Sequence, residues 1–375
     1  MLKMNNVPGH MGRRQILFGL AAVSLAGCSD GAAMQPVVLG DTDPDPLWQI
    51  RLPADAPVDI WARHLHLPSL RNSPQMLALS GGAEDGAFGA GALCGLSTVN
   101  RRPTFDLVTG VSTGALMAPF AFLGSEYDDT LRSIFTEHDA KDIMRFRGVN
   151  AVRSDALYDT TPLADLIKHY TPSALLDAIA DRHQAGGRLF MVTSNLEAAR
   201  AQVWNMGAVA KRKDYGLFRA IMRASGALPG LFSPVMLRYQ ANGKDYREAH
   251  VDGGVHMQFL ATPKAAFNAP RRHSGGGHVY LLINNTLAPA PQIVSHTPLG
   301  ISQHALTTMV RSNAALSVNV ARILAKEHGL EFSVACVNPD VGVEYDPSDR
   351  FSGEYMNALF QHGYTRAISG RLWEG

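Results

Sequence analysis

Short apolar runs alternate with helical patterns along most of the chain. From residue 75 onward, runs typical of strands occur at 76–79, 105–108, 188–193, 201–204, 279–283 and 332–337. Helical patterns lie between or beside them at 86–96, 113–122, 162–170 and 301–328, with Thr161 expected to cap the third. Two more strands flank Asn242-Gly243, a pair typical of a hairpin turn: 235–239 and 246–251. This alternation predicts an α/β fold with a mostly parallel central sheet and helices on both faces.

Residues 1–27 have the pattern of an export signal. A basic start that includes Arg13 and Arg14 is followed by the apolar run 16–25. Ten residues rise about 15 Å as a helix, whereas a bilayer needs about 20 residues, so we expect no membrane-spanning anchor here. The Arg13-Arg14 pair also resembles a twin-arginine signal, and the sequence leaves the export route open.

The apolar run ends in Leu25-Ala26-Gly27-Cys28, which resembles a bacterial lipobox. This resemblance implies cleavage before Cys28 and two acyl chains anchored at its thiol. Ser29 then favours sorting to the outer membrane, facing the periplasm. We therefore expect a lipid-anchored protein of the cell envelope that contacts the membrane through Cys28. A plain signal peptide with an accidental cysteine is the alternative.

The remaining chain divides into a linker and one domain. Residues 28–73 are polar and rich in proline, which predicts a linker or approach segment, and 74–375 read as a single domain. The aspartates at 41–45 resemble a calcium loop, but Pro46 stands where such a loop needs glycine, so we expect no metal. With 34 basic and 33 acidic residues, the composition gives no reason to expect nucleic acid.

The sequence Gly110-Val111-Ser112-Thr113-Gly114 has the form G-x-S-x-G. It follows a predicted strand and opens a predicted helix, which is the arrangement that places a serine on a tight turn. Gly110 and Gly114 keep the turn free of side chains where backbone segments approach each other. Ser112 is therefore the candidate nucleophile.

Two further segments supply candidate partners for this serine. The run Ser80 to Ala87, with Gly81, Gly82 and Ala83, follows a strand and presents backbone N–H groups that acyl transfer needs for the oxyanion. It lacks the Gly-Lys-Ser/Thr ending of a phosphate-binding loop, so we expect no nucleotide. Asp252, followed by Gly253 and Gly254, lies at the end of the second hairpin strand, although an Asp-Gly pair alone would be an ordinary turn.

Together, in this order, these three segments resemble the patatin-like phospholipase family. The segments 157–163, 223–234 and 354–364 are also similar to parts of that family, so the resemblance covers about residues 74 to 370. It implies a three-layer sandwich, a lipid ester substrate and no cofactor. It also implies a Ser112–Asp252 dyad and an oxyanion hole made of Gly81, Gly82 and Ala83. Ala83 stands where the family has a third glycine, and its N–H serves this purpose without strain only at a negative φ.

Two other functions stay open. A Ser-His-Asp esterase would need a histidine after the acid, and the candidates are His273, His278, His296 and His304. His250 and His256 flank Asp252, where structural roles are expected. A non-catalytic envelope lipoprotein that keeps the fold for binding is the third possibility. Two basic clusters are candidates for contact with anionic lipid or for a solvated face: Arg145, Arg147 and Arg153, and Lys211 to Lys213.

Overall fold

The computed structural model describes residues 45, 47–65, 73–241, 244–261, 276–288, 294, 296–338, 341–347 and 349–374. The predicted signal 1–27, the lipidation residue Cys28, the hairpin turn Asn242-Gly243 and His273 lie outside these residues.

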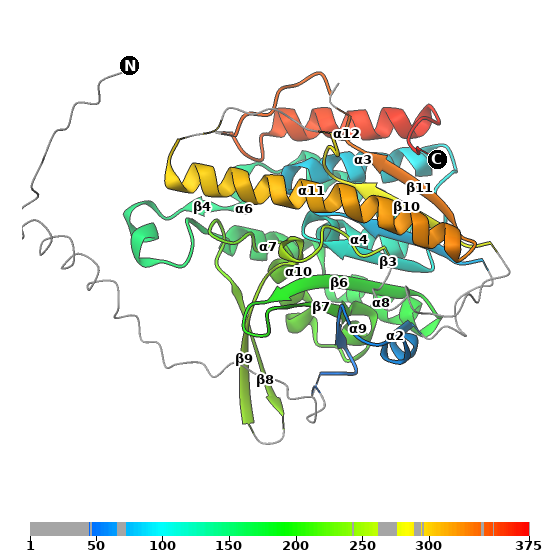
Figure 1. Ribbon diagram of the computed structural model, residues 1–375, viewed down its shortest axis with the longest axis horizontal. Helices are drawn as coiled ribbons and strands as arrows, with labels where there is room; N and C mark the ends of the chain where they lie inside the picture. The colour runs from blue at the N-terminus through cyan, green and yellow to red at the C-terminus, as the bar shows by residue number, and fades with distance from the viewer. Residues whose placement is uncertain are drawn as a thin grey trace, which may run out of the picture. The chain divides into compact units, whose positions relative to one another are not determined.

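Five adjacent parallel strands extend from the middle of one large sheet to one of its edges (Figure 1). In spatial order they are β6 (Arg188–Asn195), β3 (Leu107–Val111), β2 (Gln75–Leu79), β10 (His278–Ile283) and β11 (Glu331–Cys336). Beyond β6 the sheet continues antiparallel through β7 (Arg200–Asn205) and β1 (Arg51–Pro53). The hairpin β8 (Val235–Ala241) and β9 (Lys244–Asp252) joins the sheet through antiparallel pairing of β9 with β6. The predicted α/β fold with a mostly parallel sheet is therefore confirmed.

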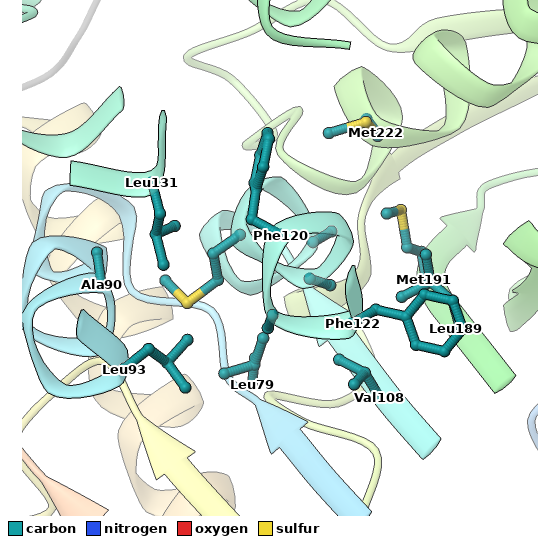
Figure 2. Close-up of a cluster of buried hydrophobic side chains, with 14 of the residues drawn as sticks. Leu79, Ala90, Leu93, Val108, Phe120, Phe122, Leu131, Leu189, Met191 and Met222 are labelled. Atoms are coloured by element: carbon teal, nitrogen blue, oxygen red, sulfur yellow. The ribbon is translucent and has the colours of Figure 1, made fainter. Parts of the chain in front are cut away.

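Both faces of the sheet are covered because successive strand residues point to opposite sides. Leu79, Val108, Leu189 and Met191 pack on one face against α3 (Gly86–Thr98) and α4 (Thr113–Leu123), and Figure 2 shows these side chains gathered around α4. Residues of the opposite face contact α11 (Pro298–Glu327) or α2 (Val58–Leu65). Helix α12 (Gly353–Ile368) packs on α3.

Shorter elements complete the domain. They are α5 (Asp128–Thr136), α6 (Ala140–Ile143), α7 (Thr161–Tyr170), α8 (Ser173–Gln184), α9 (Met206–Lys211), α10 (Tyr215–Ser225) and a small sheet of β4 (Arg145–Phe146) and β5 (Tyr158–Asp159). Thr161 is not the cap of α7 as predicted, because the helix begins at that residue and Thr160 takes the cap position. The carboxylate of Asp159 accepts the Thr161 N–H, which supplies the missing helix-end partner. Among the described residues, no helix is both long and apolar enough to cross a bilayer.

The prediction that 28–73 is a linker is wrong for residues 47–65. Strand β1 pairs with β7, and Trp61 of α2 is buried against Phe190 of β6. The short strand carries too weak a periodic signal to be recognised from sequence, because three residues show little alternation.

Arg51 fastens this segment to β9. Its guanidinium donates to both carboxylate oxygens of Glu248 and, at 2.7 Å, to Asp45. His250 Nε2 lies 3.0 Å from Glu248 Oε2. The side chains of Arg51, Glu248 and His250 are all buried. Burial opposes ionisation of Glu248, but hydrogen bonds from His250 and Arg51 hold its pKa well below the usual range. The ionic network thus supports β9, the strand that ends in Asp252.

We expect Arg51→Ala to lower the free energy of unfolding by about 3–5 kcal/mol, because it leaves the Glu248 carboxylate buried without its cation. Urea unfolding followed by circular dichroism measures this change. Arg63→Ala is the matched control, since Arg63 pairs with Asp59 on an exposed face of α2. That pair contributes only about 0.2–0.5 kcal/mol, so equal losses in the two variants would refute the structural role of Arg51.

Candidate active site

Ser112 occupies a tight turn between β3 and α4. Its backbone has φ +54° and ψ −125°, a left-handed conformation that costs a non-glycine residue about 1–3 kcal/mol. A Cβ at Gly114 would lie 2.4 Å from the Leu79 carbonyl oxygen, and one at Gly110 would lie 2.5 Å from the Gly114 carbonyl oxygen. Both glycines are therefore required by close approach of the backbone.

Ser225, at the end of α10, holds this turn in place. Its Oγ accepts the Ser112 N–H at 3.0 Å and donates to the Val192 carbonyl oxygen of β6 at 2.7 Å. The hydroxyl thus bridges the strained turn and the neighbouring strand. Ser225 lies in the segment 223–234 that resembles part of the family, but no role could be predicted for it. A lone serine gives no signal of such a bridge.

Asp252 reaches Ser112 because β3 and β9 share one edge of β6. Strand β7 pairs along the other edge. On the shared edge, Val111 faces Val192 and Asp252 faces Thr193, the next residue of β6. The end of β3 therefore lies beside the end of β9, which brings Ser112 next to Asp252.

The two side chains are in direct contact. Ser112 Oγ donates to Asp252 Oδ2 at 2.6 Å, while the Gly254 N–H donates to Oδ1 at 2.7 Å. Ser112 is 6% exposed and Asp252 is 2% exposed. Position 253 requires glycine, because a Cβ there would lie 2.5 Å from the Val192 carbonyl oxygen. Each oxygen of the Asp252 carboxylate therefore accepts one hydrogen bond, and Oδ2 accepts the one from the serine hydroxyl.

Burial raises the pKa of Asp252 to about 6, and the hydrogen bonds from Ser112 and Gly254 limit the rise. A carboxylate with this pKa is ionised at neutral pH and is a stronger base than an ordinary aspartate. The environment therefore suits Asp252 to accept the proton of Ser112.

The glycine-rich loop lies beside this pair but does not offer all three expected donors. The prediction that Gly81 supplies a donor to the oxyanion is wrong, because the Gly81 N–H donates to the Gln258 carbonyl oxygen at 3.0 Å. The N–H groups of Gly82 and Ala83 have no hydrogen-bond acceptor among the described residues. Ala83 has φ +51°, so the strain-free negative φ is not met and this residue also holds a left-handed conformation.

Two residues that sequence reasoning missed fasten the loop. Asn284, at the end of β10, is fully buried, and its Nδ2 and backbone N–H donate to the carbonyl and hydroxyl oxygens of Ser80. Its Oδ1 accepts the Gly89 N–H at the start of α3. Gln258 links the loop to the aspartate, because its Nε2 donates to the Gly254 carbonyl oxygen. The only signal for Asn284 is a polar residue directly after an apolar strand.

An apolar pocket of about 90 Å³ opens at Ser112. Ala83 also contributes to its wall, and the polar side chains His138, Tyr170 and Thr171 lie among apolar ones. The apolar lining comes mainly from α4, α5, α7 and the segment after α10: Leu116, Phe120, Ile134, Phe135, Leu163, Leu166, Ile167, Leu228 and Phe232. Such a pocket can receive a hydrocarbon chain with its reactive end at the serine.

Residues 77–263 match the family model of the patatin-like phospholipases. The chain contains a patatin-like phospholipase domain. This match assigns the domain to the lipid acyl hydrolases. No curated protein matches the chain significantly.

Solved structures that match the chain include VipD from Legionella pneumophila and the type III effector protein ExoU. VipD has a TM-score of 0.32 at 10% identity, with 80% of this chain and 67% of VipD covered. ExoU has a TM-score of 0.28 at 14% identity, with 80% of this chain covered. The matched region spans only 54% of the ExoU chain.

No histidine is among the hydrogen-bond partners of Ser112 or Asp252 within the described part of this patatin-like domain. His278 lies at the start of β10, the end remote from the turn, and pairs with Glu331. His296 is exposed and His304 lies on α11. His250 contacts Thr193 and Glu248. His256 contacts the Ser194 hydroxyl, which itself donates to the Asp252 carbonyl oxygen.

The site also offers no cluster of metal ligands. Groups of three or more His, Cys, Asp or Glu side chains arranged for a metal ion do not occur in the described ranges. The chemistry available from these residues is proton transfer between a carboxylate and a hydroxyl, beside two backbone N–H donors.

We expect kcat/KM for ester hydrolysis to fall about tenfold per pH unit below about pH 6. The sign follows from the base: above its pKa Asp252 is ionised and accepts the serine proton, and below it the carboxyl group is already protonated. Initial rates on a soluble short-chain ester, with circular dichroism at each pH to verify folding, measure the profile. A fall that begins only near pH 4 would show that burial does not raise the pKa of this group.

Proposed function

We propose that the protein hydrolyses carboxylic esters of lipids, as a phospholipase A or lysophospholipase does, with Ser112 as nucleophile and Asp252 as its base. The observation that carries this proposal is the 2.6 Å hydrogen bond between the two side chains at the end of an apolar pocket. Asp252 takes the hydroxyl proton as Ser112 Oγ attacks the ester carbonyl carbon. The alcohol leaves with that proton, and water then releases the fatty acid from the serine.

The N–H groups of Gly82 and Ala83 stabilise the oxyanion in this mechanism. Each such donor typically accounts for about 10²–10³ in rate, which a dyad without imidazole needs. Gly82 is fixed by close approach, since a Cβ there would lie 1.8 Å from the Asn284 carbonyl oxygen. Since Gly81 donates to Gln258, it shapes the loop and takes no part in binding the oxyanion.

The pocket binds the acyl chain. Its wall is predominantly apolar and offers few hydrogen-bond partners to a polar group. A polar head group therefore stays outside the pocket, on the leaving side of the ester. Lipid esters are thus favoured over small polar ones.

We expect Ser112→Ala and Asp252→Asn each to lower kcat by about 10⁴-fold or more, with the fold retained. Because the two residues act as one unit, the double variant should be little slower than the slower single variant. Fatty-acid release from phospholipid and lysophospholipid vesicles measures this, with circular dichroism as the folding check.

Ser369→Ala and Asp129→Asn are matched controls at exposed positions and should leave the rate unchanged. Replacing His273, His278, His296 or His304 by Gln should also retain most activity. A histidine variant as inactive as Ser112→Ala would establish a triad in place of the dyad. A correctly folded parent without activity on any ester would favour the non-catalytic lipoprotein.

We also propose that the mature protein begins at a diacylated Cys28 and is held at the outer membrane, facing the periplasm. The lipobox-like Leu25-Ala26-Gly27-Cys28 supports this. Two acyl chains anchor a protein stably, whereas one gives only marginal attachment. In this arrangement the acyl hydrolase domain of 74–375 also includes β1 and α2, which pair with and pack on its sheet.

Cys28→Ser should move the protein from the membrane fraction to the soluble fraction of the envelope. Intact-mass spectrometry of the native protein should show the added mass of the acyl chains, and Cys94→Ser is the control that keeps it. An unmodified mature mass, or unchanged fractionation of Cys28→Ser, would refute the anchor.

A further inference from the structure

The segment 145–153, which we call the arginine rim, adjoins two elements that line the pocket. It follows directly on α6, whose Ile143 lines the pocket. Its strand β4 pairs with β5, and Tyr158 of β5 bridges to Phe232, which lines the pocket from another side. The rim is therefore joined to the pocket wall at two places.

Two apolar side chains of the rim are presented to solvent. Phe146 is 66% exposed although one side of its ring contacts Tyr158, and Val149 is 88% exposed. Gly148, between them, has φ +57°, a left-handed turn that only glycine adopts readily and that starts the short helical segment carrying Val149.

The charges of the rim are all positive. The sequence from Ile143 to Ser154 contains Arg145, Arg147 and Arg153 and no acidic residue. Arg147 is engaged, with the Ser233 hydroxyl at 3.4 Å and Asp159 at 3.9 Å. Arg145 and Arg153 are exposed and form no hydrogen bond or ion pair with any described residue. Two cations therefore remain available to an external anion.

The described acidic residues near the rim form no ion pair with Arg145 or Arg153. Asp159 faces Arg145 across the β4–β5 pair but lies 3.9 Å from the Arg147 guanidinium. Asp142 accepts the Asp139 N–H within the cap of α6, and Asp155 accepts the Ser233 hydroxyl at 2.7 Å. Both carboxylates accept these hydrogen bonds from local groups and none from Arg145 or Arg153. A surface with exposed apolar tips between unpaired arginines matches a bilayer of anionic lipid, which offers phosphates at its surface and hydrocarbon beneath.

We propose that the arginine rim is the surface on which the enzyme docks on anionic lipid. Arg145 and Arg153 meet the phosphates, Phe146 and Val149 enter the head-group region, and the pocket mouth is held at the level of the ester bond. We assign this contact to the delivery of substrate, and that role rests on the proposed lipid hydrolysis. Binding to lipid does not depend on hydrolysis, so binding and hydrolysis are tested separately.

The test measures binding to vesicles in the full chain carrying Cys28→Ser and Ser112→Ala, so that neither acylation nor turnover contributes. Co-sedimentation compares vesicles of phosphatidylglycerol and phosphatidylethanolamine with vesicles of phosphatidylcholine alone. Each arginine near an anionic surface contributes about fivefold in affinity, so Arg145→Gln with Arg153→Gln should weaken binding to the anionic vesicles about 10- to 25-fold. The matched control is Lys211→Gln with Arg212→Gln, which removes two exposed charges from α9 and its end.

Val149→Ser tests the apolar part without disturbing the Phe146–Tyr158 contact and should weaken binding about fivefold. Its control is Leu316→Ser on α11, which is 70% exposed. Unchanged binding in both rim variants, or equal losses in the controls, overturns the proposal. So does equal binding to both kinds of vesicle.

Hydrolysis distinguishes the docking surface from the active site. With Ser112 intact, the rim variants should keep the parent rate on a soluble short-chain ester and require about tenfold more vesicle lipid for half-maximal rate. If the parent hydrolyses no ester, the proposed function fails while the sedimentation result still decides whether the rim binds lipid. A rim variant that loses soluble-ester activity in proportion to its vesicle activity contradicts a role confined to docking.

Discussion

The site depends on one edge of β6 that two other strands share. Strand β3 occupies this edge as far as Val192 and β9 takes it over at Thr193, so Ser112 and Asp252 meet where one strand ends and the other arrives. Backbone hydrogen bonds of a sheet fix the relative position of paired residues, and a shift by one residue would turn every side chain to the other face. The 2.6 Å contact is therefore a consequence of register, which the buried network of Arg51 on β1 with Glu248 and His250 on β9 supports within the same sheet.

The same arrangement creates the chemical properties of the pair. A carboxylate enclosed between strands loses water, and the resulting rise in its pKa makes it a useful base near neutral pH. The left-handed Ser112 is unfavourable by itself, but Ser225 bonds its N–H and α4 packs into the core around it (Figure 2). Strain at the nucleophile and burial of the base are both unfavourable to folding, and both persist because the surrounding contacts fix the backbone.

The sequence predicted what is encoded locally. The apolar runs located the parallel strands, and the three motifs named the residues that the structure brings together at Ser112. It could not predict that Gly81 donates to Gln258, that Asn284 holds Ser80, or that Ser225 bonds the turn, because each contact joins segments far apart in the chain. β1 and α2 were missed for a related reason. A strand as short as β1 has no clear period, and its place beside β7 is set by tertiary pairing and by the buried Arg51.

The chemistry is arranged in the order of the strands. The base ends β9, which pairs with β6, the nucleophile follows β3, and the glycine-rich loop follows β2. Strands β6, β3 and β2 are neighbours in the sheet. The ends of β9, β3 and β2 therefore bring a carboxylate, a hydroxyl and backbone donors side by side without a long loop. Ser225 ties the nucleophile to the β6 side and Asn284 ties the donor loop to the β10 side, so the reacting groups are held from both directions. Neither Ser225 nor Asn284 lines the pocket. The sheet therefore sets the spacing between base, nucleophile and donors, whereas the pocket and the arginine rim determine which ester reaches them.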